Sequence, residues 1–512
     1  MPTIVNNLDS SDAYVWIANA YFLTMTAFQP LYGQTANIFG RRSLIVIAVV
    51  LFAVGSAVSG AAKSTAALIA GRTVQGIGGG GINVLVDIIV CDLVPLRERS
   101  KFMGVIFSVF AVGLSLGPVI GGLMTQRVTW RWIFYLNLPI CGVALVLLVL
   151  FLKVQYKKDS GQNMVRRIDF AGNALLIASV LAVLLALTWG GTKHPWSSWR
   201  TIVPLILGLL GQGGFLALQS SKLIPEPTMP IRLFSNRTSL STFALTFVHA
   251  ILTYWLTYFL PVYFQSALEA SPIQSGINLL ASAITAIPFA ILAGGGLTKL
   301  GRYRPFHFVG IGLLTIAFGL FTRLDAHSST GYWVGIQILG AAGTGILLTT
   351  TLPAIQAPLG EGDVAVATAT WGFLRSFGGV WGVAIPSAVF NSQVNDLLGR
   401  VQSAELRQTL ANGGAYAVAS RKFMRSLSQT PALKAQVLGV YVDSLKLVWQ
   451  VGIAFGLLGF LIALVVKEIP MREQLETEFG MVDDGDDKGS SESPGDVELA
   501  HEKQPNLAAS GN

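Results

Sequence analysis

The sequence has 512 residues, of which 52% are hydrophobic and 12% are charged, whereas a soluble domain carries about a quarter charged residues. This composition excludes a soluble globular protein and predicts that most of the chain lies in a membrane. The net charge of +8 does not indicate a nucleic-acid partner, because the basic residues cluster in short loops between apolar segments. Cys91 and Cys141 are too few for a disulfide framework or a cysteine-based zinc site.

Thirteen segments are long and apolar enough to cross a bilayer, which takes roughly 20 residues in a helix. They lie at 13–36, 43–62, 66–91, 100–124, 132–152, 169–190, 201–220, 238–264, 272–298, 305–323, 331–356, 364–390 and 440–466. Basic residues concentrate in alternate loops, beginning with the loop at Arg41 and Arg42, and the positive-inside rule places those loops in the cytoplasm. The long loop 391–439 is then extracellular, and the odd number of spans places the N-terminus outside.

A faint internal repeat divides the chain into two halves. Residues 33–42 and 294–304 each place a glycine seven residues before a Gly-Arg pair, which is typical of transporters built from two similar helical halves. We therefore predict an N-terminal bundle at 1–152, a linker with two extra spans at 153–237 and a C-terminal bundle at 238–466. The remainder, 467–512, is rich in aspartate and serine, and we expect a disordered, acidic cytoplasmic tail.

The uncharged stretch 104–122 places small residues on one face of a helix. Gly113, Gly117 and Gly121 are spaced four apart, and Pro118 interrupts the series. Small residues at this spacing allow two helices to approach closely in lipid, and a proline frees a backbone carbonyl and bends its helix. We interpret the stretch as a bent packing joint between transmembrane helices.

Five motifs follow one another along the chain. They are Gly33-x3-Asn37-x2-Gly40-Arg41-Arg42, Arg72-x2-Gln75-Gly76-x-Gly78-x-Gly80, Gly104-x8-Gly113-x3-Gly117-Pro118-x2-Gly121-Gly122, Trp130-Arg131-Trp132-Ile133-Phe134-Tyr135-x-Asn137-x-Pro139 and Leu260-Pro261-Val262-Tyr263-Phe264-Gln265. Over residues 1–466 the chain therefore resembles the major facilitator superfamily, in particular its fourteen-span drug:proton antiporters of fungal type. One such motif is a weak signal, and five in the right order are a strong one.

This resemblance implies an all-α polytopic membrane fold of two pseudo-symmetric helical bundles around a central cavity, with two extra helices between the halves. It implies that the helix of residues 104–122 belongs to the hinge and that residues 33–42 form a loop that gates the cytoplasmic side. The family usually has aspartate where this chain has Asn37, which weakens a charge relay through that loop. The family's first helix ends in a segment much like Met1–Ile4, so we expect that this chain lacks that helix and that the native N-terminus is longer.

Charged residues inside predicted spans are candidates for a substrate or proton path, because charges in a membrane usually face an interior cavity. Arg72, Gln75, Asn83 and Asp87 lie in one predicted span, and Arg375 lies near the middle of another. In the family, the arginine that matches Arg72 is tied to proton movement. Structural alternatives remain: Arg72 bonds to carbonyls of a neighbouring helix, Asp87 anchors a helix end, and Arg375 is a tie between helices.

Two groups of aromatic residues can line an apolar substrate pocket at the interface of the halves, or can instead face lipid or the membrane interface. They are Tyr254, Trp255 and Tyr258 on one predicted helix, and Trp371, Phe377 and Trp381 on another. His249 can titrate in the physiological range, although a lone histidine among apolar neighbours is more often a neutral, hydrogen-bonded side chain. We take the six aromatic residues as pocket candidates.

The sequence favours transport over catalysis. Gly76-x-Gly78-x2-Gly81 matches a dinucleotide-binding fingerprint by letter, but no predicted strand precedes it, so its glycines are better explained as packing positions. The sequence contains no phosphate-binding loop and no recognisable nucleophile–base pair, so we expect no cofactor, no metal and no enzyme activity. We predict a monomeric secondary exporter that moves a small apolar toxin, drug or secondary metabolite outward in exchange for protons.

The direction of transport rests on the resemblance in the 104–122 motif, and two alternatives remain open. One is a proton-coupled importer, for example of a ferric siderophore, and the other is a sensor or a truncated form that does not transport. We expect the protein in the plasma membrane, with the vacuolar membrane as the alternative.

Overall fold

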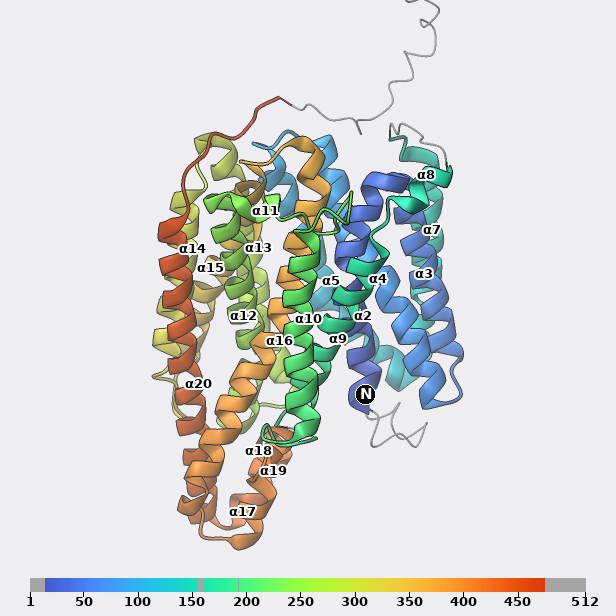
Figure 1. Ribbon diagram of the computed structural model, residues 1–512. Coiled ribbons are helices and arrows are strands. Elements are labelled where there is room, and N and C mark those ends of the chain that lie inside the picture. Colours follow the sequence, from blue (N-terminus) through green and yellow to red (C-terminus); the bar gives the residue numbers. More distant parts are fainter. Residues whose placement is uncertain (1–13, 155–160, 192, 475–512) are drawn as a thin grey trace, which may run out of the picture.

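The computed structural model describes residues 14–154, 161–191 and 193–474, and its regular structure over those ranges is helical (Figure 1). Eleven segments in these ranges are long and apolar enough to cross a membrane. They are α3 (Arg41–Ala61), α4 (Thr65–Leu93), α6 (Trp132–Tyr135) joined to α7 (Asn137–Phe151), α9 (Phe170–Trp189), α10 (Trp199–Gln219), α12 (Arg237–Ser266), α13 (Pro272–Leu300), α14 (Arg304–Phe321), α15 (Thr330–Gln356), α16 (Val364–Leu397) and α20 (Pro431–Val465).

Two further long helices, α2 (Tyr14–Phe39) and α5 (Arg99–Arg127), lie in the same bundle. Each of the thirteen predicted spans therefore falls on a helix, and the predicted all-helical membrane fold is confirmed. Helices α2, α3 and α4 pack together in the first half, and α12, α14, α15, α16 and α20 pack together in the second. The halves meet where α2 and α4 contact α16 and where α5 contacts α13 and α15.

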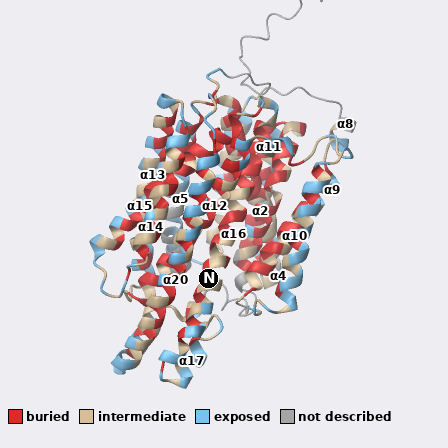
Figure 2. Ribbon diagram, turned by 60° about the vertical axis from the view of Figure 1, so that its left-hand side comes forward, coloured by how far each residue is buried: buried red, intermediate tan, exposed pale blue. Residues whose placement is uncertain are grey.

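Burial follows this arrangement. Figure 2 shows buried residues through the middle of the bundle and many exposed residues on α10. The exposed residues of α10 include Leu207 and Leu210, as expected for a helix that faces lipid. The second half has a core of large aromatic side chains, among them Trp255, Phe318 and Trp449.

The two ends of the bundle differ in the elements that they carry. One end holds α8 (Gly161–Arg166), α11 (Arg232–Ser235), the junctions that contain Arg41 and Arg97, and the segment that follows α20 (Figure 1). We call it the basic end. The opposite end holds the start of α2 together with α17 (Ala404–Leu410), α18 (Gly414–Val418) and α19 (Arg421–Ser426).

The segment predicted as an extracellular loop, 391–439, is instead largely helical. Helix α16 continues to Leu397, α20 already begins at Pro431, and α17, α18 and α19 lie between them. Leu410 and Met424 are fully buried there, and the Tyr441 hydroxyl donates a hydrogen bond to the Ala415 carbonyl at 2.6 Å. Polar residues lower the hydropathy of this region below that of a span, although its apolar residues still pack.

The glycines of α4 allow that helix to pack tightly between α2 and α3. A Cβ atom added to Gly80 would lie 2.5 Å from the Met25 carbonyl oxygen on α2. One added to Gly78 would overlap the Phe52 amide nitrogen on α3, and one added to Gly76 would overlap the Thr24 side chain. These residues are therefore packing positions, as predicted, and not part of a nucleotide site.

We predict that Gly78→Ala destabilises the protein, because its methyl group would meet backbone atoms of α3 that cannot move aside. Overpacking of this kind typically costs about 1–3 kcal/mol, and thermal unfolding of the purified protein in detergent measures it. Gly276→Ala on α13 is the matched control, since a Cβ atom there has no heavy atom within 4 Å. Equal melting temperatures for the two variants would contradict the packing role of Gly78.

Candidate functional site

Arg72 lies in a polar network inside the first half of the bundle. Its Nε donates a hydrogen bond to the Ile17 carbonyl of α2 at 3.2 Å, and its Nη1 donates to Gln75 Oε1 at 2.7 Å. Gln75 Nε2 in turn donates to Ser56 Oγ of α3 at 2.8 Å. The guanidinium also lies over the Tyr21 ring, 4.4 Å from its centroid. These partners are all uncharged, so the charge of Arg72 is solvated by neutral groups.

Arg375 of α16 lies where the two halves meet. Its guanidinium carbon is 4.3 Å from the ring centroid of Trp371 on the same helix and 5.2 Å from that of Phe107 on α5. Asp87 of α4 and His249 of α12 are both buried, and both interact electrostatically with Arg375. Four helices from the two halves thus bring ionisable and aromatic groups to one place.

This cluster contains polar atoms that the described residues leave without hydrogen-bond partners. Arg375 Nη1 and His249 Nε2 are both buried and unpaired within the described ranges. A buried unpaired polar group typically costs about 1–3 kcal/mol, so such groups are rare unless a ligand, a water molecule or another conformation pairs them. The cluster is therefore the best candidate in the described structure for a site where a proton or a substrate binds.

The predicted coupling residues separate into two sets. Arg375 and Asp87 belong to the cluster between the halves, together with His249, which sequence reasoning had taken as structural. Arg72 and Gln75 form the separate network in the first half. Asn83 belongs to neither set, and its amide lies 3.6 Å from Met25 Sδ.

The six aromatic candidates also separate. Trp255 is fully buried and packs on Phe318 and Phe455 inside the second half, with ring centroids 6.0 and 5.8 Å away. In this conformation Trp255 belongs to the core of the second half, and its place in a substrate pocket stays a prediction. Its neighbour Tyr254, about 100° further round the helix, faces α16 instead, where its ring touches Gly379.

The remaining aromatic residues lie on or next to α16. Trp371 is buried and its Nε1 donates to Thr351 Oγ1 at 3.0 Å. Phe377 contacts Trp381 edge to face at 6.3 Å between ring centroids, and Trp381 Nε1 is buried without a partner among the described residues. Tyr258 is partly exposed and stacks on the Tyr254 ring. The rings of Trp371, Phe377 and Trp381 on α16, with those of Tyr254 and Tyr258 on α12, form what we call the aromatic surface, near Arg375.

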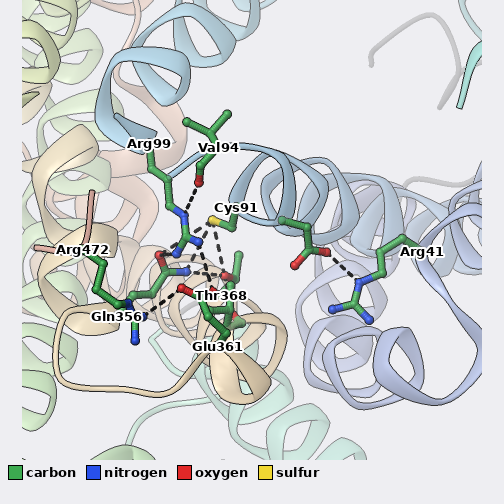
Figure 3. Close-up of polar contacts among 10 residues, drawn as sticks. Arg41, Cys91, Val94, Arg99, Gln356, Glu361, Thr368 and Arg472 are labelled. Carbon is green, nitrogen blue, oxygen red and sulfur yellow. Dashed lines mark hydrogen bonds and ion pairs between the residues drawn. The ribbon is translucent and has the colours of Figure 1, made fainter. Parts of the chain in front are cut away.

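The predicted gate loop is almost entirely helical, which corrects the sequence-based interpretation. Gly33 and Asn37 lie within α2, and only Gly40, with φ of 80°, separates α2 from α3. Arg41 Nε donates to Asp92 Oδ2 at 2.7 Å in a nearly fully buried ion pair (Figure 3). Arg42 donates to the Val149 carbonyl of α7 at 2.6 Å. The two arginines therefore fix helix ends within the first half.

A second polar cluster joins the two halves at the basic end. Arg99 of α5 donates to Gln356 Oε1 at 2.8 Å and forms an ion pair of 3.3 Å with Glu361. Gln356 also donates to Thr368 Oγ1 at 2.9 Å and lies against the buried Cys91 thiol (Figure 3). This cluster was not predicted, because Arg99 has the sequence context of an ordinary basic loop residue.

The segment after α20 extends the same connection. The Tyr303 hydroxyl donates to the Lys467 carbonyl at 2.7 Å and accepts from the Ile469 amide at 2.8 Å. Burial raises the pKa of Tyr303, so the hydroxyl keeps the proton that it donates. Further along, Arg472 forms an ion pair with Glu361 at 3.1 Å, and its carbonyl accepts from the Arg97 amide at 3.2 Å.

This segment corrects the predicted boundary of the disordered tail. Residues 467–474 are described and bonded to both halves, whereas 475–512, the rest of the predicted tail, lie outside the described residues.

Among the described side chains of α5, the contact with α13 lies at the Gly104 end of the glycine motif. A Cβ atom on Gly104 would lie 3.4 Å from Ala290 and Ile291 of α13, so the two helices are close there. Gly113 and Gly117 are exposed, and no heavy atom lies within 4 Å of their Cβ positions. The predicted close packing at these two glycines is therefore absent from this conformation. The burial and contacts of Pro118 and Gly122 lie outside what is described of α5.

Comparison with known proteins identifies relatives over nearly the whole chain. The model of the Major Facilitator Superfamily matches residues 1–383. The chain is 51% identical over 499 residues to the MFS-type efflux pump LUC4 of Fusarium sp, which covers 97% of this chain and 88% of that protein. It is 49% identical to the MFS efflux transporter aclA of Aspergillus oryzae, with 94% of this chain and 87% of that protein covered.

Solved structures support the fold. The human organic anion transporter MFSD10 matches with a TM-score of 0.54 and 18% identity, covering 88% of this chain and 83% of that chain. The proton:xylose symporter XylE matches with a TM-score of 0.53 and 14% identity, covering 93% and 90%. The chain belongs to the Major Facilitator Superfamily of multi-pass membrane transporters, as its motifs predicted.

Proposed function

We propose that this chain is an efflux pump that exports a small organic compound, such as a toxin or secondary metabolite, in exchange for protons. Relatives that share about half of their residues with it carry the name of efflux pump or efflux transporter. The observation that carries the mechanism is the cluster of Arg375, Asp87 and His249 between the two halves. It supplies ionisable groups at the interface that alternating access opens and closes.

The orientation follows from charge. The positive-inside rule places the basic end in the cytoplasm. The contacts of Arg99 with Gln356 and Glu361 then close the cytoplasmic side. Toward the outside, α5 and α13 are further apart, and Gly113 and Gly117 of α5 have open space beside them. This arrangement corresponds to a conformation that faces outward. We propose the plasma membrane as its location and a monomer as its working unit.

The cluster suggests how proton movement is coupled to transport. An ionised carboxylate inside a membrane is costly unless an opposite charge lies near it, and Arg375 supplies that charge for Asp87. When Asp87 takes up a proton, its electrostatic attraction to Arg375 is lost, and Arg375 becomes free to change its contacts with Phe107 and the aromatic surface. Because Phe107 and Arg375 belong to different halves, this change biases the relative position of the halves. Arg72 has a supporting role in the first half.

The proposal predicts transport driven by a proton gradient. Inverted vesicles that contain the full-length chain should accumulate a fluorescent lipophilic dye when their interior is acidified, and should lose this uptake when the gradient is collapsed. Uptake that persists unchanged without a gradient would contradict proton coupling while leaving export itself intact.

Asp87→Asn tests the proposed coupling residue. The variant cannot ionise, so we expect gradient-driven uptake to fall at least about tenfold, which corresponds to a loss of about 1.4 kcal/mol. Exchange of labelled for unlabelled dye across the membrane should survive, because that exchange needs no net proton movement. Asp443→Asn is the matched control, since Asp443 forms an exposed ion pair with Arg400 outside the cluster. Equal activity of the two variants would remove Asp87 from the mechanism.

Glu361→Gln tests the closure at the basic end. The change weakens the ion pairs with Arg99 and Arg472, so the basic end should open more often. Cys91 reports this opening, because it is fully buried behind Gln356. In a Cys141→Ser background, we expect a membrane-permeant maleimide to label Cys91 several times faster in the Glu361→Gln variant. Glu226→Gln, which weakens an ion pair with Arg167 outside this cluster, is the control, and equal rates would contradict the closure.

A further inference from the structure

Gln29 is a buried polar residue that the described structure leaves without hydrogen bonds. It lies in the middle of α2, its side chain is fully buried, and neither its Nε2 nor its Oε1 has a partner among the described residues. In other buried glutamines of the described part of the chain, the side-chain oxygen, the side-chain nitrogen or both have hydrogen-bond partners. Gln356 bonds to Arg99 and Thr368, and Gln337 Oε1 accepts from Ser282.

Gln29 lies at the contact between the two halves. One turn further along α2, a Cβ atom on Gly33 would overlap Ala369 of α16, so the two helix backbones are very close. A Cβ atom added to Gly372, one turn along α16, would lie 4.0 Å from Gln29 Oε1 and 3.4 Å from Val84 of α4. The carboxamide is therefore enclosed by α2 and α4 of one half and α16 of the other.

Burying this carboxamide is unfavourable in the conformation that faces outward. Each unpaired amide group typically costs about 1–3 kcal/mol, and an apolar side chain of the same size would pack there without that cost. A movement of the halves that opens the basic end would separate α2 from α16, which are in contact here, and would uncover Gln29 toward the cytoplasm. Its hydrogen-bonding groups are therefore available to a ligand in the conformation that loads cargo and are withdrawn in the conformation that releases it.

The chemistry of the side chain defines the ligand that it fits. A carboxamide presents one oxygen acceptor beside an N–H donor. The complementary group is an N–H donor beside a carbonyl acceptor on the same face, which is the arrangement of a cis amide in a lactam ring. One turn along α16 from Gly372, Arg375 Nη1 is also buried and unpaired, so the same region holds a further donor suited to a carbonyl oxygen.

We propose that Gln29 binds cargo only in the cytoplasm-facing conformation and selects compounds that carry a lactam or another cis N–H/C=O pair. This inference rests on the proposed export function and adds a cargo class to it. Closure of α2 against α16 removes the two hydrogen bonds from the cargo, which lowers its affinity on the side where it must leave. Selection and release thus use the same residue.

The test compares two probes that differ in one hydrogen-bond donor. They are a radiolabelled phenyl-substituted 2-pyrrolidinone and its N-methyl derivative, and a lipophilic dye without an amide serves as a reference cargo. In inverted vesicles with a proton gradient, the cytoplasmic face is accessible from the medium. We expect the wild-type chain to show a KM about tenfold lower for the N–H lactam than for the N-methyl compound, and Gln29→Met to show equal values.

Gln337→Met is the matched control. Gln337 is also a buried glutamine with an unpaired Nε2, but it lies on α15 and bonds to α13 within the second half. This variant should keep the tenfold preference for the N–H lactam. Gln29→Met should also melt at the same or a higher temperature than the wild type, because it removes an unsatisfied amide from the closed interface.

The outcomes separate this inference from the export function. The inference is overturned if the wild type exports the dye without preferring the N–H lactam, if Gln29→Met keeps the preference, or if that variant melts at a lower temperature. If the wild type exports neither the dye nor either lactam, the proposed export function itself is wrong, and the cargo class falls with it.

Discussion

The contact of Arg99 with Gln356 and Glu361 is the interaction on which this conformation depends. The Arg99 side chain is fully buried between the halves, so its charge needs polar partners. These are the Val94 carbonyl of its own half, and Gln356 and Glu361 of the opposite half. Removing one member of a buried ion pair typically costs about 3–5 kcal/mol, unless water takes the place of the lost member. Opening the basic end admits that water. The same contact can therefore hold the closed state firmly and still allow it to open.

Some buried polar groups in the described structure are paired with neighbours, and others, inside the second half as well as between the halves, keep unpaired atoms. Arg41 pairs with Asp92, and the amide nitrogen of Asn173 donates to Gln34 and Thr228, as expected for groups that stabilise a fold. Gln29, His249 and Arg375 retain unpaired atoms and lie at the interface between the halves. Groups with unpaired atoms weaken a static bundle, because their desolvation is not compensated. In a transporter, another conformation or a ligand can compensate the desolvation of Gln29, His249 and Arg375, which lie where the two halves move against each other.

Hydropathy was sufficient to predict the thirteen helices, because the bilayer requires a length and a composition that are visible in the sequence. It failed at 391–439, where amphipathic helices pack outside the spans. The cost of charges in a membrane pointed to Arg375 and Asp87 in the sequence, but not to their electrostatic interaction, which requires helices from both halves to be placed in space. Trp255 and Tyr254 are adjacent in the chain and face different surfaces, so a list of aromatic residues could not separate core from site. Gln29 is one of several polar residues in its span, and only its missing partners distinguish it.

The central claim is that the two halves open and close at the basic end as cargo is exported. A distance measurement by electron paramagnetic resonance tests it directly, with spin labels at Ser43→Cys and Arg302→Cys, two exposed positions on opposite halves, in a Cys91→Ala, Cys141→Ser background. Alternating access at this end predicts two distances in the reconstituted protein, and a shift of population toward the longer one when a transported compound is added on the cytoplasmic side. A single distance that no transported compound or proton gradient changes would show that the halves do not open and close there.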